Sequence, residues 1–475
     1  MKRPTQRLFA FCVLVVVLRL VTLQAQSQSP LGVWIGTLDA GAKLRLVVRI
    51  TAGADGSLIG KLDSPDQGAL GITIDSVTLK NKTLRFELKV IGGVFEGTLD
   101  EPGTEISGNW SQGGFSAPLV LKKTDGAPEL NRPQEPQKPH PYDEEEVVYE
   151  NAPARIRLAA TLTLPRSAQP VTAVVLLTGS GAQDRDESVA GHRPFLVLSD
   201  YLTRKGIAVL RADDRGVGGS TGKVSTSTSE DFASDALAGV AYLKTRKEID
   251  PKRIGLVGHS EGGLVAPLAA GRSDDVAFVV LMAGPGLPGE DILLLQSKLI
   301  FAAVGLNQDL VAKSLELNAQ VYSILRKEQD PVAAEKALRE LWKTSSATFS
   351  ETEKTLLGFS DAIWEAQIKQ VLSPWFRYFL SYDPRPALSK VRCPILAIIG
   401  ERDLQVPAKQ NLAAIESALK EAGHKSYAIR ELPGLNHLFQ TAKTGAPTEY
   451  AQITETISPA VLELIGNWIL EKTGR

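Results

Sequence analysis

From residue 143 onward, short apolar runs alternate with longer stretches of helical pattern. The apolar runs that predict buried strands lie at 173–177, 207–210, 254–257, 278–282 and 395–399. The helical stretches that separate or follow these runs lie at 195–205, 230–247, 261–270, 407–421 and 455–471. Strands that alternate with helices in this way predict an α/β fold, with a mostly parallel sheet and helices on both of its faces.

Before residue 123 the pattern is that of β structure. Runs at 43–50, 83–90 and 115–121 alternate or carry β-branched and aromatic residues, and turns such as "AGADG" and "DEPG" separate them. About eight strands in about ninety residues predict a small antiparallel barrel or sandwich over 30–122. No catalytic constellation occurs there, so we expect an accessory domain that packs or binds, because a fold alone does not assign a function.

Two further segments separate or interrupt these domains. Residues 123–142 hold five prolines and few apolar groups, which predicts an extended linker in which His140 is solvated. Between about 288 and 391, strand signals vanish and helical runs such as "PVAAEKALRELWKT" take their place. An insertion of this length predicts a helical cap over a site, with a plain helical subdomain as the alternative.

The first residues have the layout of a secretory signal peptide. Basic residues precede an apolar run of eleven residues, 8–18, and Ala25 then leads into polar sequence. A membrane span is the competing interpretation, but Arg19 ends the run and spanning needs about 20 apolar residues. We therefore expect residues 1–25 to be a signal peptide, no membrane span after its removal, and a periplasmic or secreted protein.

Charge and composition exclude several classes of function. The 53 basic and 54 acidic residues are spread along a chain of 475 residues, so no basic stripe indicates a nucleic-acid partner. Loss of Cys12 with the signal would leave Cys393 alone and no intrachain disulfide. The five histidines show no metal-site spacing, so we expect neither a metal nor another cofactor.

Two serines fit the pattern G-x-S-x-G, which marks the nucleophile of many hydrolases. Ser260 in "GHSEGG" lies between a buried-strand run and the start of a helix, where its flanking glycines permit a tight turn. Ser220 in "GGSTG" lies in a polar stretch without apolar period, which is typical of a turn. The context therefore assigns Ser260 as the nucleophile and Ser220 as a structural loop residue.

A serine nucleophile needs a base, and the base needs an acid that orients it. Of the histidines that follow Ser260, we favour His437, in the loop "LPGLNHLF" after a strand-like run, over His424, at a helix end. For the acid we favour Asp403, which follows the buried run at 395–399. Glu401 and Asp383 are the alternatives, and a capping role for Asp403 stays open.

Backbone N–H groups are expected to stabilise the negative charge that develops on the substrate. The N–H of Glu261 lies at the start of a helix, and the N–H of Ser180 or Gly181 lies in a loop of small residues after the run at 173–177. In the charged stretch that follows, Arg185 and Asp186 are expected to form structural ion pairs rather than to contact substrate.

With these residues assigned, the region 143–475 resembles the α/β-hydrolase superfamily. The motifs that carry the resemblance are "TGSGAQDRDE", "RADDRGVGGS", "GHSEGG", "GERD" and "GLNH". Within the superfamily the chain is similar to exported bacterial serine carboxylesterases of the EstD type, which carry an N-terminal β domain. The resemblance implies a triad of Ser260, His437 and Asp403 and activity on short acyl esters. The loop Thr-Gly-Ser-Gly stands where many esterases have His-Gly-Gly-Gly.

The sequence thus predicts an exported serine carboxylesterase that cleaves a small-molecule ester through an acyl-enzyme, without a cofactor. Two alternatives remain. One is a serine peptidase, amidase or acyltransferase with the same triad. The other is a non-catalytic binding protein, against which the three triad residues in the expected chain order argue.

Overall fold

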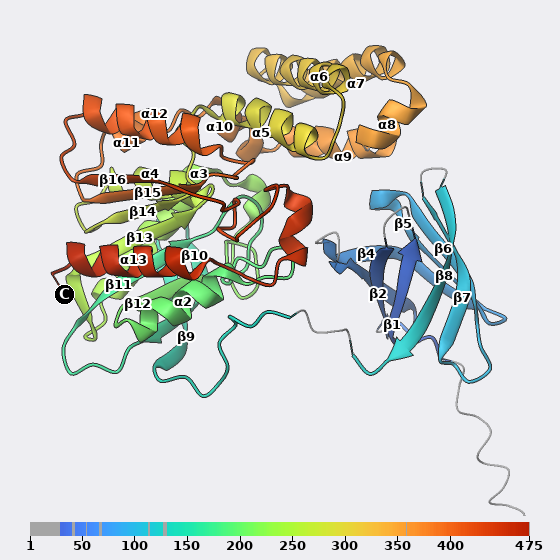
Figure 1. Ribbon diagram of the computed structural model, residues 1–475, viewed down its shortest axis with the longest axis horizontal. Helices are drawn as coiled ribbons and strands as arrows, with labels where there is room; N and C mark the ends of the chain where they lie inside the picture. Colours follow the sequence, from blue (N-terminus) through green and yellow to red (C-terminus); the bar gives the residue numbers. More distant parts are fainter. Residues whose placement is uncertain are drawn as a thin grey trace, which may run out of the picture. The chain divides into compact units, whose positions relative to one another are not determined.

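The computed structural model describes residues 29–39, 43–53, 55–65, 69–112, 115–126, 131–357 and 359–474 (Figure 1). The predicted signal peptide lies outside these residues. The chain divides into two compact units, the first ending at Glu129 and the second running from Leu130 to Arg475. Each unit is described by itself.

The first unit is a closed antiparallel barrel, so of the two predicted architectures the barrel is confirmed. Its strands are β1 (Gly32–Asp39), β2 (Lys43–Ala52), β3 (Leu58–Ser64), β4 (Ala69–Lys80), β5 (Thr83–Leu88), β6 (Gly93–Leu99), β7 (Glu105–Gln112) and β8 (Phe115–Thr124). Pairing of β1 with β8 closes the ring and removes free strand edges. Alternate residues point inward, and the aromatic rings of Trp34, Phe86, Phe95 and Trp110 fill the interior.

The second unit is built on an eight-stranded mixed sheet in the order β16-β15-β14-β13-β11-β12-β10-β9. Its strands are β9 (Asp143–Asn151), β10 (Ile156–Leu164), β11 (Val171–Leu177), β12 (Ala208–Ala212), β13 (Ile249–His259), β14 (Val279–Met282), β15 (Ile395–Gly400) and β16 (Tyr427–Leu432). Neighbours from β12 to β16 are parallel, which confirms the predicted mostly parallel sheet. The antiparallel β9 and β10 extend one edge.

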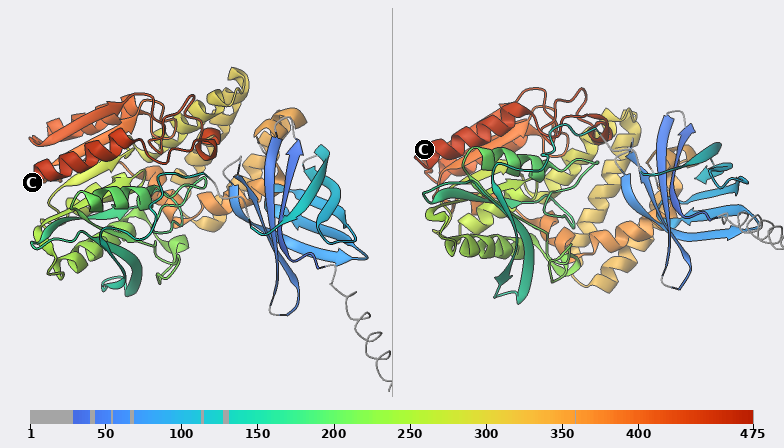
Figure 2. Two further views of the ribbon diagram at one scale, coloured as in Figure 1. Left: turned by 60° about the horizontal axis from the view of Figure 1, so that its bottom comes forward. Right: turned by 90° about the horizontal axis from the view of Figure 1, so that it is seen from below.

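Helices cover both faces of this sheet (Figures 1 and 2). The helices are α2 (Pro194–Arg204), α3 (Ser229–Lys244), α4 (Gly262–Ala270), α12 (Ala408–Glu421) and α13 (Pro459–Lys472). One apolar core lies between the sheet and α3, α4 and α12, and a second lies between the sheet and α2 and α13. Because both faces are buried, β14 and β15 are apolar throughout rather than alternating.

Between β14 and β15, the described residues form helices and no strand, as the pattern predicted. The helices are α5 (Gly289–Ala303), α6 (Gln308–Lys327), α7 (Pro331–Ser345), α8 (Glu351–Leu357), α9 (Asp361–Val371), α10 (Pro374–Ser381) and α11 (Arg385–Leu388). They have a core of their own, in which the rings of Trp342 and Trp364 stack at 4.6 Å. We refer to α5–α10 as the helical insertion. None of the described helices is long and apolar enough to cross a membrane.

Much of the expected linker packs against the second unit. Arg132 donates hydrogen bonds to the carbonyl oxygens of residues 190, 191, 451 and 453, and Gln134 bonds the backbone of Thr456 and Ile457. The prediction of a solvated His140 is wrong. Its side chain is only 7% exposed and its ring stacks on Tyr142 at 4.9 Å. Hydrogen bonds to distant backbone groups hold a segment that has few apolar residues.

Candidate active site

The candidate residues lie in loops that leave one edge of the second sheet. Ser180 and Gly181 follow β11, Ser260 and Glu261 follow β13, Asp403 follows β15, and His437 follows β16. These strands are parallel, so their carboxyl ends meet at the same edge. The fold therefore gathers side chains that lie far apart in the chain.

Ser260 occupies a tight turn between β13 and α4. Its φ of 52° lies in the left-handed region, which is uncommon for a residue other than glycine and costs about 1–3 kcal/mol. A Cβ on Gly258 would lie 2.0 Å from the carbonyl oxygen of Gly262, and a Cβ on Gly262 would lie 2.1 Å from that of Leu177. The two glycines are thus required by close backbone contacts, which hold Ser260 in the strained turn.

Asp403 and His437 form a buried pair. His437 Nδ1 lies 2.8 Å from Asp403 Oδ2, and the two residues are 3% and 2% exposed. The other carboxylate oxygen of Asp403 accepts the N–H groups of Gln405 and Val406, so the carboxylate is held in place. This arrangement gives the imidazole a single orientation with Nδ1 toward the carboxylate.

The alternative candidates have other partners. Glu401 accepts the backbone N–H of Gly434, and Asp383 pairs with Arg385. His424 Nε2 bonds the carbonyl oxygen of Cys393. The structure therefore brings Asp403, and neither of the other two carboxylates, to His437.

Ser260 lies close to this pair without a direct hydrogen bond. Among the described residues, no hydrogen bond joins Ser260 Oγ to His437. The adjacent residue His259 connects Ser260 to His437. The two histidine ring centroids are 4.8 Å apart, and His259 Nε2 lies 2.9 Å from the His437 carbonyl oxygen. Catalytic hydrogen bonds commonly shorten only when substrate binds.

The loop after β11, residues 178–183, presents free N–H groups beside Ser260. A Cβ on Gly179 would lie 3.3 Å from that of Ser260, which places the loop against the serine. The N–H groups of Gly179 and Gln183 are bonded by Glu187 and Asp214. Those of Ser180 and Gly181 have no partner within the described part of the chain, and both residues are exposed. They are free to bind an oxyanion, as is the N–H of Glu261 at the start of α4.

Buried and partly buried carboxyl groups surround this loop. Burial raises the pKa of Asp214 to about 7, although Gln183 and Thr178 donate hydrogen bonds to it. Burial also raises the pKa of Glu261, whose carboxylate accepts hydrogen bonds from Ser229, Trp375 and Ser180. Because a raised pKa reduces negative charge, these acids oppose an oxyanion less than ordinary carboxylates at the same positions would.

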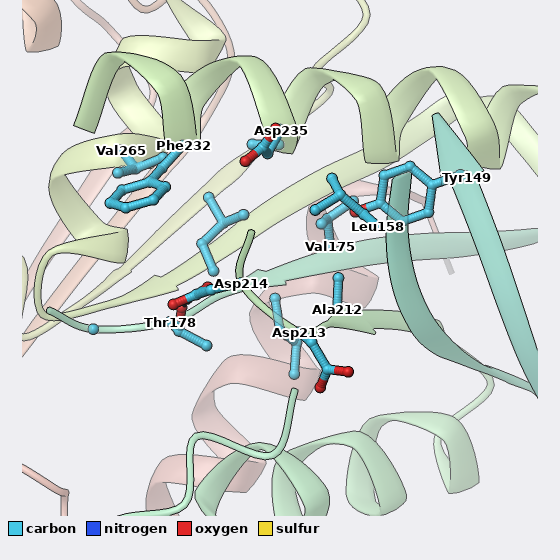
Figure 3. Close-up of a pocket in the computed structure, with 14 residues that line it drawn as sticks. Tyr149, Leu158, Val175, Thr178, Ala212, Asp213, Asp214, Phe232, Asp235 and Val265 are labelled. Atoms are coloured by element: carbon cyan, nitrogen blue, oxygen red, sulfur yellow. Dashed lines mark hydrogen bonds between the residues drawn. The ribbon is translucent and has the colours of Figure 1, made fainter. Parts of the chain in front are cut away.

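Asp214 and Thr178 also line an interior cavity of about 50 Å³ (Figure 3). Its walls come from β9–β12, α3 and α4, and include Tyr149, Phe232 and Asp235. The volume suffices for a few water molecules. Ser260, Asp403 and His437 do not line this cavity, so we do not assign it as the substrate site.

The residues predicted to be structural are structural. The Ser220 hydroxyl donates to the Asp213 carbonyl oxygen and accepts the N–H of Ala159. Arg185 pairs with Asp213, and Asp186 pairs with Arg211. No cluster of metal-ligating side chains occurs in the part of the chain that the structure describes.

Three residues near the site were given no role from the sequence. Glu187 and His259 form a buried pair beside His437, and Trp375 of α10 bonds Glu261 from the helical insertion. His259 lies within "GHSEGG", next to Ser260, and this was the one available signal. Nothing in the chain spacing shows that Glu187, 72 residues earlier, contacts it.

Comparison with known proteins agrees with this architecture. The model of the Alpha/beta hydrolase family matches residues 174–453, which is more than half of the chain. Esterase EstD of Thermotoga maritima is 26% identical over 335 residues, covering 70% of this chain and 69% of that protein, so the expected similarity is confirmed.

Two solved structures are similar to this chain at low sequence identity. Est1E from Butyrivibrio proteoclasticus with bound ferulic acid is 18% identical and covers 69% of this chain and 100% of its own, with a TM-score of 0.40. The Pyrococcus furiosus esterase Pf2001 is 17% identical and covers 74% of this chain and 99% of its own, with a TM-score of 0.42. From the family match and the sheet that carries these loops, the chain belongs to the alpha/beta hydrolase family.

Proposed function

We propose that this hydrolase is a serine carboxylesterase that cleaves short-chain esters through an acyl-enzyme. The observation that carries the proposal is the buried His437–Asp403 pair, 2.8 Å between Nδ1 and Oδ2, beside a serine held in a left-handed turn. Similarity to Esterase EstD supports an ester substrate.

In the proposed mechanism, Ser260 Oγ attacks the acyl carbon and its proton passes to His437 Nε2. Asp403 keeps Nδ1 protonated and balances the charge on the imidazole. The oxyanion accepts the N–H of Glu261 and that of Ser180 or Gly181. The bond from the acyl carbon to the alcohol oxygen then breaks, and His437 gives its proton to the leaving alcohol. Water, deprotonated by His437, attacks the acyl carbon, the bond to Ser260 Oγ breaks, and His437 returns the proton to Oγ as the carboxylic acid leaves. The helical insertion acts as a cap over the acyl site.

We also propose that the protein is exported, with residues 1–25 as the signal peptide and the mature chain in the periplasm or outside the cell. The N-terminal sequence of protein recovered from the periplasm or the medium tests this. A mature N-terminus near residue 26 supports export, and retention of residue 1 contradicts it.

The proposed nucleophile is tested by Ser260→Ala with short p-nitrophenyl esters as substrates. Turnover should be lost because no other group forms the acyl-enzyme, while the fold survives the removal of one hydroxyl. Ser220→Ala is the matched control, because it occupies the same sequence pattern but bonds only backbone groups. Its turnover should stay close to that of the wild type.

Fluorophosphonate labelling provides a second measurement, because the reagent modifies only an activated serine. The wild type should be labelled at Ser260. Full turnover in Ser260→Ala would contradict the proposal, and absence of both labelling and turnover in the wild type would favour a binding protein. Faster cleavage of an aminoacyl amide than of the matching ester would favour a peptidase.

A further inference from the structure

A second buried ionisable pair lies beside the proposed triad. His259 and Glu187 are 5% and 3% exposed, and His259 Nδ1 lies 2.8 Å from Glu187 Oε1. Neither side chain takes part in the mechanism above. Buried charged groups are costly unless they are paired, so a pair at this place needs an explanation.

The contacts of this pair determine its protonation. His259 Nε2 faces the His437 carbonyl oxygen at 2.9 Å, and a carbonyl oxygen only accepts, so Nε2 carries a proton. Nδ1 faces a carboxylate oxygen that also accepts the N–H of Gly179 at 2.6 Å. With a proton on both nitrogens, His259 is an imidazolium and Glu187 a carboxylate. Burial lowers the pKa of His259, but the charge and hydrogen bond of Glu187 outweigh burial and raise it overall.

The pair connects three segments that each carry a proposed functional group. His259 immediately precedes Ser260, its Nε2–H holds the backbone of His437, and Glu187 holds Gly179 in the loop that offers the oxyanion donors. Glu187 has a φ of 53°, an uncommon conformation that aims its side chain at this junction. The nucleophile turn, the base loop and the oxyanion loop thus meet at one ion pair.

We infer that the His259–Glu187 ion pair is a positioning element that sets the location of the base His437 relative to Ser260 and the oxyanion loop. The inference rests on the proposed function. The charged His259 ring also lies beside the His437 ring, with 4.8 Å between the ring centroids. The ionisable groups that face His259 are Glu187, His437 and Asp403.

The test compares His259→Asn with two more conservative changes. In His259→Asn the amide keeps a donor toward Glu187 but loses the bond to the His437 carbonyl oxygen. Because small displacements of a catalytic group can cost about 100-fold in rate, kcat/KM should fall by about 10-fold to 100-fold, mainly through kcat. The rate of fluorophosphonate labelling should fall by a similar factor. In His259→Gln the amide N–H replaces Nε2–H, so this variant should recover part of the loss.

The third variant, Glu187→Gln, removes the charge of the pair. His259 then loses its counter-ion and becomes neutral. The Glu187 oxygen that faces Nδ1 also accepts the Gly179 N–H, and one amide atom cannot both donate to Nδ1 and accept that N–H. Either Gly179 or the His437 carbonyl oxygen then loses its partner, so kcat/KM should also fall in this variant.

The matched control is His424→Asn. It also removes a bond from histidine Nε2 to a backbone carbonyl oxygen, here that of Cys393 at 3.0 Å, away from the site. It should leave kcat/KM unchanged. If Ser260→Ala is inactive but His259→Asn keeps kcat/KM within about two-fold of this control, the inference alone is overturned. If the wild type neither turns over esters nor reacts with fluorophosphonate, the proposed function is overturned instead.

A measurement on the unmodified protein does not depend on whether the variants fold. Nitrogen NMR of the wild type near neutral pH should show His259 protonated on both ring nitrogens. A neutral ring with one N–H would overturn the ion pair and therefore the inference.

Discussion

At the residue scale, three carboxyl groups hold the loop that carries the proposed oxyanion donors, and Glu187 and Glu261 are buried while Asp214 is partly buried. Asp214 bonds Thr178 and Gln183, Glu187 bonds Gly179, and Glu261 bonds Ser180. Each interaction orders part of a loop whose free N–H groups remain exposed. The proposed donors are therefore oriented before any substrate binds, which is the condition under which such donors stabilise an oxyanion strongly.

The raised pKa of Asp214 predicts a pH dependence of stability. The carboxyl group has a pKa of about 7 when folded against a usual 3.8. Between these values the folded state keeps a proton that the unfolded state has released, so stability falls as pH rises through this window. Asp214→Asn does not titrate, and its amide retains both hydrogen bonds, with N–H toward the Thr178 hydroxyl. Its free energy of unfolding relative to the wild type should therefore rise from pH 4 to about 7 and then level off.

Denaturant unfolding at several pH values measures this difference, and the neighbouring Asp213 provides a control of opposite sign. Burial raises the pKa of Asp213, but its hydrogen bonds with Arg185 outweigh burial and lower it overall. Asp213→Asn should thus lose stability relative to the wild type above the unfolded pKa, and the loss should shrink in acid. If the free energy of unfolding of Asp214→Asn relative to the wild type does not change with pH, the prediction is contradicted.

The sequence alone located the residues with strong local signals. Ser260 was predicted because its motif lies between a buried-strand run and the start of a helix. His437 was predicted from its loop and its place after Ser260 in the chain, and Asp403 because it follows a buried strand whose end lies at the edge of the sheet. Glu187 and His259 were not predicted, because their contact depends on how the loop after β11 turns back over β13. Hydrophobic periodicity does not indicate which distant residues form a buried ion pair.

At the element scale, α10 connects the helical insertion to Glu261. Trp375 Nε1 donates to Glu261 Oε1 at 2.7 Å, and its ring stacks on Phe379 at 5.4 Å. Tyr378 of the same helix bonds Glu230 of α3 at 2.8 Å. Glu261, the residue after the proposed nucleophile, is therefore connected to the helical insertion through the indole N–H of Trp375.

This connection is tested by Trp375→Phe, which removes the N–H but keeps an aromatic ring against Phe379. Loss of a donor to a buried carboxyl group costs about 1–3 kcal/mol of stability. Because the backbone N–H of Glu261 is a proposed oxyanion donor, kcat/KM for short esters should also fall, by about 10-fold. Thermal unfolding and steady-state kinetics measure the two effects.

Trp342→Phe is the matched control within the helical insertion. Trp342 Nε1 donates to Asp361 at 2.8 Å, and the ring stacks on Trp364, so the same chemical change occurs away from the site. Its melting temperature should fall while kcat/KM stays at the wild-type value. Equal kinetics in the two variants would show that the bond to Glu261 has no part in catalysis.

At the scale of the whole molecule, each unit has its own apolar core, and the described partners of the proposed triad all come from the second unit. The start of that unit lies before β9, because Arg132 and Gln134 bond the segments at 190–191 and 451–457. A boundary placed at residue 143, where the regular pattern begins, omits these bonds.

Two truncated chains test this boundary. A chain of residues 131–475 should fold and keep ester turnover close to that of the full chain. A chain of residues 143–475 should unfold at a lower temperature, because several backbone carbonyl oxygens lose the Arg132 donor at roughly 1 kcal/mol each. Equal melting temperatures of the two chains would contradict the boundary, and loss of turnover by the longer one would give the barrel a role in catalysis.

The sequence by itself predicted most of the elements, the order of the domains and the three residues of the proposed triad, because hydrophobic period and turn glycines are local properties. The antiparallel strands β9 and β10 were not among the predicted runs. Tertiary structure decided that the β domain is a closed barrel, that residues 131–142 belong with the second unit, and that Glu187, His259, Asp214 and Trp375 surround the site. The reason is physical. Strand closure, buried pairing and raised pKa values arise only when distant segments exclude water from each other.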